Sequence, residues 1–293
     1  MKNLNISDTV EASSSGNISF SAEKVRAQLF GGLMDPVIGF DHFKLTKDVF
    51  GAHPHAGMSA LSYLFEDSVP YHNLDSIGTD VMITPGSLMW TWAGRGVVHT
   101  EFPVPEGSEV HGLQLFINMP AKQKQTAPKG TFINSPDIPE IISAGFRVRV
   151  VTGRSGAVIN QAVIPQDITF LHIFLTGEES FSHELPSGWN GTVYVVNGKT
   201  ELAVGEEKRL LEQSSVICFS SLENQKVTFS PNGGCQLIFI SGAPLKEEIF
   251  AHGSLTMGSN DELAKAMSDF NEGRMGFIRM EDGNRKVVLP VLK

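Results

Sequence analysis

Four residues with metal-binding side chains fall into two pairs of the same spacing. One residue separates His53 from His55, one residue separates His99 from Glu101, and His99 lies 44 residues beyond His55. On a β-strand, residues i and i+2 point to the same face about 7 Å apart, so each pair can converge on one ion if its strand curves. Three neutral imidazoles and one carboxylate suit a divalent transition metal such as Fe(II), Mn, Co, Ni, Cu or Zn. The alternative interpretation is that these are surface or turn histidines.

The elements that must position these pairs are short strands. Alternating or apolar runs rich in β-forming residues recur along the chain and are broken by Gly, Pro, Asn and Asp. They cover residues 59–65, 80–84, 112–118, 147–152, 169–175, 192–196, 215–219, 226–229 and 236–241. This spacing of strands and turns is typical of an all-β sandwich or barrel. The chain between the two pairs is long enough for a hairpin and a return strand, so the pairs can meet across a sheet.

Outside the strands, the pattern predicts one helix, one linker and a loose N-terminus. Ser259 and Glu262 have capping-box spacing, an apolar stripe follows them, and Gly273 is placed to end the helix. Residues 119–140 are rich in Pro, Lys, Gln and Ser, as in a linker between two strand-rich halves. Residues 1–17 are polar and Ser-rich, and we expect them to be frayed.

Length and charge narrow the class of protein. A chain of 293 residues favours two domains of about 140 residues each. The net charge of -9 disfavours direct nucleic-acid binding, which relies on basic side chains that neutralise phosphates. The two cysteines, Cys218 and Cys235, form no metal or disulfide motif and are expected to be buried thiols. We find no secretory-type N-terminus and no apolar run of about 20 residues, so we predict a cytoplasmic protein without membrane association.

Several segments resemble the pirin family of the cupin superfamily. The most specific is residues 84–101, TPGSLMWTWAGRGVVHTE, which resembles the second cupin motif as pirins carry it. The others are FDHF at 40–43, HPHAG at 53–57, GLQLFINMP at 112–120 and the tail from 252 to 276. The resemblance therefore runs from about residue 30 to residue 276.

The resemblance implies an all-β fold of two tandem cupin barrels, each a double-stranded β-helix or jelly roll, with a short C-terminal helix. It implies a metal-binding barrel at residues 1–133 and a metal-free barrel at residues 134–293 that ends in the helical tail. The family's four ligands carry over onto His53, His55, His99 and Glu101. One divalent transition metal per chain is expected, Fe(II) first, with Mn, Ni, Co, Cu or Zn as alternatives.

The second half and the first motif both depart from the metal-binding pattern. Alignment of the two tyrosine-containing strands places Glu184 and Pro186 opposite the first two histidines, and a proline side chain cannot ligate. In the first motif, Ala56 and Ser59 stand where pirins usually have Arg and Glu. The four-ligand set survives, but the polarity near the site changes.

Other residues near the motifs are predicted to support the site or to pack in the core. Asp41, His42 and Gln114 are candidates to hydrogen-bond the second ring nitrogen of a ligand histidine. Trp90 and Trp92 are expected to pack in the core rather than line the mouth of a pocket. The remaining histidines show no ligand pairing and are expected to be structural, namely His72, His111, His172, His183 and His252.

Two functions are compatible with these ligands. The resemblance implies a quercetin 2,3-dioxygenase-like enzyme that cleaves a flavonol with dioxygen. In that reaction the metal favours the deprotonated substrate oxygen, and Glu101 is the catalytic base. The alternative is a metal- and redox-sensing regulator that binds transcription factors or other proteins. A roomy apolar pocket that opens on the metal would favour the enzyme.

Overall fold

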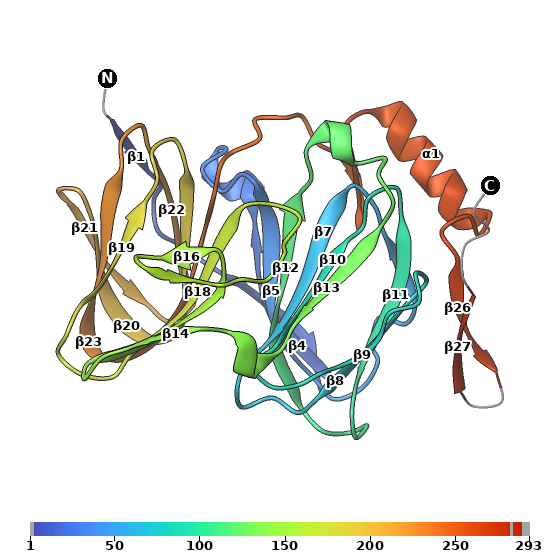
Figure 1. Ribbon diagram of the computed structural model, residues 1–293, viewed down its shortest axis with the longest axis horizontal. Coiled ribbons are helices and arrows are strands. Elements are labelled where there is room, and N and C mark those ends of the chain that lie inside the picture. Colours follow the sequence, from blue (N-terminus) through green and yellow to red (C-terminus); the bar gives the residue numbers. More distant parts are fainter. Residues whose placement is uncertain (1–2, 282–283, 289–293) are drawn as a thin grey trace. The chain divides into compact units, whose positions relative to one another are not determined.

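The structure is a computed structural model that describes residues 3–281 and 284–288. Strands dominate it, and the described residues contain one α-helix (Figure 1). In chain order the elements are β1 (Leu4–Ile6), β2 (Val10–Glu11), β3 (Ser13–Asn17), β4 (Phe20–Arg26), η1 (Ala27–Phe30), β5 (Val37–Leu45), β6 (His53–His55), β7 (Met58–Leu64), β8 (Tyr71–Asp75), β9 (Asp80–Ile83), β10 (Leu88–Trp92), β11 (Val97–Pro103), β12 (Val110–Asn118), η2 (Ala121–Gln123), β13 (Lys129–Ile133), η3 (Ser135–Asp137), β14 (Glu140–Ile142), β15 (Phe146–Thr152), β16 (Arg154–Ser155), β17 (Val158–Ile159), β18 (Ile168–Leu175), β19 (Phe181–Leu185), β20 (Asn190–Val204), β21 (Glu207–Glu212), β22 (Ser215–Ser221), β23 (Gln225–Gly242), β24 (Phe250–His252), β25 (Leu255–Met257), α1 (Asn260–Asn271), β26 (Phe277–Glu281) and β27 (Asn284–Val288). The predicted all-β fold with a short C-terminal helix is confirmed.

The chain forms two compact units that are not continuous in sequence. The first barrel, as we call it, contains residues 14–24, 39–135 and 247 onward. The second barrel contains the residues up to 13, residues 25–38 and residues 136–246. The expected division of the chain into two cupin barrels at residues 1–133 and 134–293 stays a prediction.

The first barrel combines two sheets. A seven-stranded sheet has the order β13-β10-β7-β12-β5-β4-β3, and a four-stranded sheet has the order β6-β11-β8-β9. Apolar side chains such as Phe43, Leu64, Tyr71 and Ile83 form a buried cluster in this unit. Both predicted ligand pairs lie on the four-stranded sheet, because β6 carries the first pair and β11 carries the second.

The second barrel is built on one ten-stranded sheet. Its main path is β1-β22-β20-β23-β18-β15-β14, and β20 and β23 are long strands of 15 and 18 residues. Alternating inward side chains fill it with a large apolar cluster that includes Phe219, Phe229 and Phe239. This interior is packed with hydrocarbon, as a barrel stabilised by its own core requires.

The helix prediction is confirmed, and the prediction of a frayed N-terminus is wrong for the described residues. Ser259 caps α1 by accepting a hydrogen bond from the Glu262 N–H, and Gly273 follows with φ +71°. At the N-terminus, residues 4–6 pair with β22 instead of fraying. The polar composition gave no sign of this strand. Its pairing with β22 uses backbone hydrogen bonds, which do not require a run of apolar side chains. No helix in the described part of the chain is long and apolar enough to cross a membrane.

Candidate metal centre

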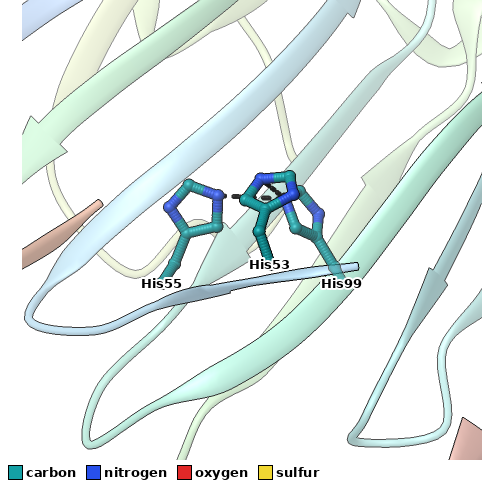
Figure 2. Close-up of side chains that lie close together, drawn as sticks. All are labelled: His53, His55 and His99. Atoms are coloured by element: carbon teal, nitrogen blue, oxygen red, sulfur yellow. Dashed lines mark hydrogen bonds between the residues drawn. The ribbon is translucent and has the colours of Figure 1, made fainter. Parts of the chain in front are cut away.

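Strand pairing brings the two predicted pairs face to face. Strands β6 and β11 run antiparallel, with His53 opposite His99 and His55 opposite Val97. Residues two apart on a strand share a face, so three imidazoles point to one side of the sheet. Figure 2 shows the rings of His53, His55 and His99 turned toward one another. Among groups of three or more His, Cys, Asp or Glu in the described part of the chain, these three are the one set whose ligand atoms all lie within 4.8 Å of each other.

The distances between the ring nitrogens fit a shared cation. His99 Nε2 lies 2.9 Å from His55 Nε2 and 3.1 Å from His53 Nε2. Two nitrogens bound at right angles to one ion, with bonds of about 2.1 Å, would be about 3.0 Å apart. The spacing therefore suits a transition metal that takes nitrogen ligands at right angles.

The second nitrogen of two rings fixes where the protons sit. His53 Nδ1 lies 2.9 Å from the Gly51 carbonyl oxygen, and His99 Nδ1 lies 3.4 Å from Asn73 Oδ1. Both partners are acceptors, so each Nδ1 carries the hydrogen and each Nε2 presents a lone pair. Two lone pairs at 3.1 Å repel each other unless a cation lies between them. A metal ligated by Nε2, with Nδ1–H bonded to an acceptor, resolves this conflict.

Burial keeps the three rings neutral. Loss of hydration lowers the pKa of His53, and it places the pKa of His55 and His99 well below the usual value. Proximity to the other imidazoles of the group lowers the pKa of His55 and His99 further. A neutral imidazole is the form that binds metal, so the group is prepared to accept an ion at neutral pH.

Glu101 lies near the three histidines, and its place as the fourth ligand stays a prediction. It follows His99 by two residues on β11 and lines the same cavity. Ser62 Oγ donates a hydrogen bond of 2.7 Å to Glu101 Oε1. Burial raises the pKa of Glu101 to about 7, although the Ser62 hydrogen bond opposes that rise. A bound divalent cation would favour the charged carboxylate.

The three candidates for supporting roles have different positions. Asp41 lines the cavity beside the ligands. Gln114 reaches the site indirectly, because its side-chain oxygen lies 2.9 Å from the Ser62 Oγ that also contacts Glu101. His42 does not support the three-histidine group and pairs with His111 instead. Asn73, which does contact His99, was missed because nothing in a lone asparagine 26 residues before a histidine marks it as a partner.

A cavity of about 200 Å³ opens on this group. On the same measure a single water needs about 10–15 Å³, so there is room for a small organic molecule. Four phenylalanines, one leucine and one tyrosine share the wall with seven polar side chains, four of which are the predicted ligands. The lining residues are Phe20, Asp41, Phe43, Leu45, Phe50, His53, His55, Tyr71, His99, Glu101, Gln114, Phe116 and Ser254.

Trp90 and Trp92 lie outside this lining and are buried, as core packing requires. The Trp90 indole N–H donates to Ser59 Oγ at 2.9 Å, so the hydroxyl that replaces the family's usual Glu satisfies a buried tryptophan. Ala56 is also fully buried and packs in a cluster with Val98 and Leu255. Neither departure from the family pattern places a new charge in the cavity.

The C-terminal segment fastens the strand that carries the first ligand pair. Ser254 Oγ donates to the Pro54 carbonyl oxygen, between the two histidines. Ala56 bridges Leu255 in parallel fashion, and Thr256 N donates to Ala56 O at 2.9 Å. Strand β6 is therefore held by β11 on one edge and by residues 254–256 on the other.

A buried lysine strengthens the same attachment. Lys124 Nζ donates to Gly57 O at 2.7 Å, Asn118 Oδ1 at 2.6 Å and Thr256 O at 3.1 Å. Its side chain is inaccessible to solvent, and desolvation lowers its pKa to about 8. Three acceptors satisfy the three ammonium hydrogens, which makes this burial tolerable.

Comparisons with known proteins agree with this architecture. The family model Pirin matches residues 16–117, and the model Pirin C-terminal cupin domain matches residues 170–276. Human Pirin is 28% identical over 255 residues, covering 87% of each chain. A Pseudomonas aeruginosa protein named "Putative quercetin 2,3-dioxygenase" is 29% identical over 235 residues, covering 78% of this chain and 79% of its own.

Solved structures share the fold. A quercetin 2,3-dioxygenase from Acinetobacter baumannii superposes with a TM-score of 0.83 at 24% identity, covering 94% of this chain and 99% of its own. A bacterial pirin from Escherichia coli in complex with nickel(II) has a TM-score of 0.58 at 16% identity, covering 82% and 99%. Fold and site together define a protein of two tandem cupin barrels with a histidine group suited to a divalent metal. Within that class, the chain belongs to the pirin family.

Proposed function

We propose that this protein is a metal-dependent dioxygenase that acts on flavonol-type, quercetin-like substrates. One divalent transition metal, Fe(II) first, would be held by His53, His55, His99 and Glu101. The observation that carries the proposal is the cavity of about 200 Å³, because the three histidines and Glu101 all line it together with aromatic side chains. A regulator that only senses metal has no need of a chamber for a small molecule at its ion.

Two relatives support a metal-dependent dioxygenase function. The Pseudomonas aeruginosa relative carries a quercetin 2,3-dioxygenase name, and a related bacterial pirin was crystallised with nickel(II). Aromatic rings such as Phe20, Phe43 and Phe116 offer an apolar wall to a flat aromatic substrate. The partners expected for this site are therefore a small aromatic molecule and dioxygen.

Within this proposal the chain's own residues have separate tasks. When bound, the metal supplies Lewis acidity that favours the deprotonated form of a substrate hydroxyl. Glu101 accepts that hydroxyl's proton. Burial raises its pKa to about 7 in the absence of an ion, and a bound cation would keep the carboxylate charged and able to accept the proton. Ser62 holds Oε1 of this carboxylate by a hydrogen bond of 2.7 Å, which fixes the orientation of the other oxygen.

The first prediction concerns Glu101→Gln. Glutamine keeps the shape and a carbonyl oxygen, and three histidines remain, so metal should still bind, though more weakly. Glutamine cannot take up a proton at ordinary pH, so turnover per bound metal should fall roughly 100- to 10,000-fold, the usual range for loss of a general base. The measurement is aerobic flavonol turnover divided by metal content from elemental analysis.

The matched control is Glu109→Gln, which changes an exposed carboxylate that pairs with Lys44 at 2.9 Å. It should leave turnover per metal unchanged. Equal turnover per metal in wild type and Glu101→Gln would remove Glu101 from the role of base. If the wild type turns over no flavonol when loaded with iron, manganese, nickel or copper, the regulatory alternative replaces the enzyme.

A further inference from the structure

A second pair of histidines meets nitrogen to nitrogen in the first barrel, on the other face of the seven-stranded sheet. His42 on β5 and His111 on β12 have their Nε2 atoms 2.7 Å apart. Their neighbours Asp41 and Gln114 line the metal cavity, and alternation along each strand turns His42 and His111 to the opposite face. Both side chains keep slight solvent access, at 13% and 12% exposure.

Carboxylates lie behind both rings. Asp67 Oδ1 is 2.8 Å from His111 Nδ1, and Asp67 Oδ2 is 3.0 Å from it. Glu23 Oε2 is 3.9 Å from His42 Nδ1. A carboxylate behind the outer nitrogen of an imidazole is the usual arrangement around a metal-bound histidine, because it favours the proton on that nitrogen and makes the other a better ligand.

A hydrogen bond between the two rings requires a different tautomer in each ring. His111 donates its Nδ1–H to Asp67, so its Nε2 carries a lone pair. His42 then donates from Nε2, and its Nδ1, which lies 3.9 Å from Glu23 Oε2, carries a lone pair. A cation bound by both Nε2 atoms would instead let both rings carry the proton on Nδ1 and present two Nε2 lone pairs to the ion. Burial lowers the pKa of both rings, that of His42 to about 4, so a second proton is a poor cation for this place at neutral pH.

Packing against Phe65 holds the imidazole rings of His42 and His111 in orientations from which both can bind one cation. Phe65 packs edge-on against both, with ring centroids 5.3 Å from His42 and 4.6 Å from His111. Packing of this kind limits the rotation of the imidazoles. Two nitrogens bound tetrahedrally to Zn²⁺ lie about 3.3 Å apart, so the two Nε2 atoms, now 2.7 Å apart, would separate by about 0.6 Å on binding.

We propose that His42 and His111 form a second, exchangeable site for a divalent transition metal such as Zn²⁺, with water as the remaining ligands. Two protein nitrogens bind an ion more weakly than three nitrogens and a carboxylate do. The site would therefore empty during stringent washing and fill when free metal is added. It does not depend on the proposed enzymatic function, because its residues lie on the other face of the sheet from the cavity.

The test is a calorimetric titration with Zn²⁺ in a background where the first site is disabled by His53→Ala and His99→Ala. We expect one saturable binding event per chain. His111→Gln in this background should abolish that event. Asp67→Asn keeps both imidazoles and should weaken the event about tenfold, the lower end of the range for a lost carboxylate partner, because Asp67 is largely exposed.

The matched control is His72→Gln, which removes another histidine–carboxylate pair, His72 with Asp80 at 2.6 Å. It should leave the Zn²⁺ event unchanged. An event that survives His111→Gln, or that His72→Gln reduces equally, would identify adventitious surface binding and overturn the proposal, as would no event in the background protein.

A second measurement avoids substitutions. Crystals of the unaltered protein, soaked in Zn²⁺ after the first site is loaded, should give an anomalous difference peak between the Nε2 atoms of His42 and His111. A map with zinc elsewhere and none at this pair would overturn the proposal even if a variant failed to fold.

Discussion

At the scale of single residues, burial decides which histidines carry a charge. His53, His55 and His99 are kept neutral by loss of hydration, and their lone pairs are available to a metal. The same physical effect acts on His183 in the second barrel, where no comparable ligand group exists among the described residues. Neutral buried histidines are therefore necessary for a metal site without being sufficient for one.

The lowered pKa of His183 predicts how the free energy of unfolding changes in acid. Its side chain is 5% exposed, its Nδ1 lies 3.0 Å from Ser155 Oγ, and burial lowers its pKa to about 4. The unfolded chain, with a histidine pKa near 6.5, binds a proton between pH 6.5 and 4 that the folded chain does not. The contribution of neutral His183 to stability is therefore present above about pH 6.5 and is lost as the pH falls toward 4.

We expect the free energy of unfolding of the wild type to fall by about 2 kcal/mol more than that of His183→Gln between pH 7 and pH 5. Urea unfolding of both metal-free proteins at the two pH values measures this difference, which also cancels the other titrating groups. Equal pH dependence in the two proteins would contradict the prediction. So would an NMR titration that places the His183 ring near its unperturbed pKa.

The three histidines that come together were predictable from the sequence, whereas their hydrogen-bond partners were not. Two i, i+2 pairs on strand-like chain point to a ligand group. The Gly51 carbonyl that orients His53 is a backbone atom, and a backbone atom has no distinctive residue type. Ser62 reaches Glu101 across 39 residues and becomes its neighbour only when β7 has found its place in the barrel.

At the scale of elements, the three-residue strand β6 is too short to hold two ligands in place alone. Its pairing with β11 involves only residues 53–55, and the remaining support comes from residues 254–256 and from Lys124. The lysine links the chain just after His55, at Gly57, to Thr256 on β25. The geometry of the metal group thus depends on a segment 200 residues away in the sequence.

Lys124→Met tests this dependence. Methionine fills a similar space but donates no hydrogen bonds, so the Gly57 and Thr256 carbonyls and the Asn118 side chain lose a buried donor. We expect at least about 2 kcal/mol of lost stability, because each buried polar group left unsatisfied costs about 1–3 kcal/mol. Metal affinity should fall as well, since the loosened β6 presents its histidines less accurately.

The control is Lys122→Met, because Lys122 is exposed only two residues away. It should change neither stability nor metal affinity. If Lys124→Met lowers the unfolding free energy and leaves metal affinity at the wild-type value, Lys124 supports the fold without positioning the ligands.

The elements themselves were predictable to different degrees. The helix was the easiest, because its cap, its apolar stripe and its terminal glycine act within one segment. The predicted linker at 119–140 contains a strand, β13, whose pairing with β10 depends on tertiary contact rather than on its own apolar pattern. The attachment of residues 254–256 to β6 has no local signature at all, since it uses backbone groups and one serine hydroxyl.

At the scale of the whole molecule, the candidate metal group and the larger apolar core lie in different units. All four predicted ligands belong to the first barrel, which has its own apolar cluster. The second barrel buries a larger cluster that includes Phe181, Phe219 and Phe239, and it needs no ion to account for its packing. The fold should therefore persist without metal, unlike small domains whose folding free energy comes from the ion.

His99→Ala is the decisive variant for this claim. Purified wild type should carry close to one transition metal per chain after stringent washing, and His99→Ala should carry far less, because His99 Nε2 lies within 3.1 Å of both other ring nitrogens. Its circular dichroism and cooperative melting should match those of metal-free wild type. Bound metal stabilises the folded state by mass action. The gain is about 4 kcal/mol when the free metal concentration is 1,000 times the dissociation constant. Loss of the metal therefore lowers the melting temperature without removing the cooperative transition. Two firmly bound metals per chain would contradict the single-site prediction, and an unfolded metal-free wild type would show that the ion is structural.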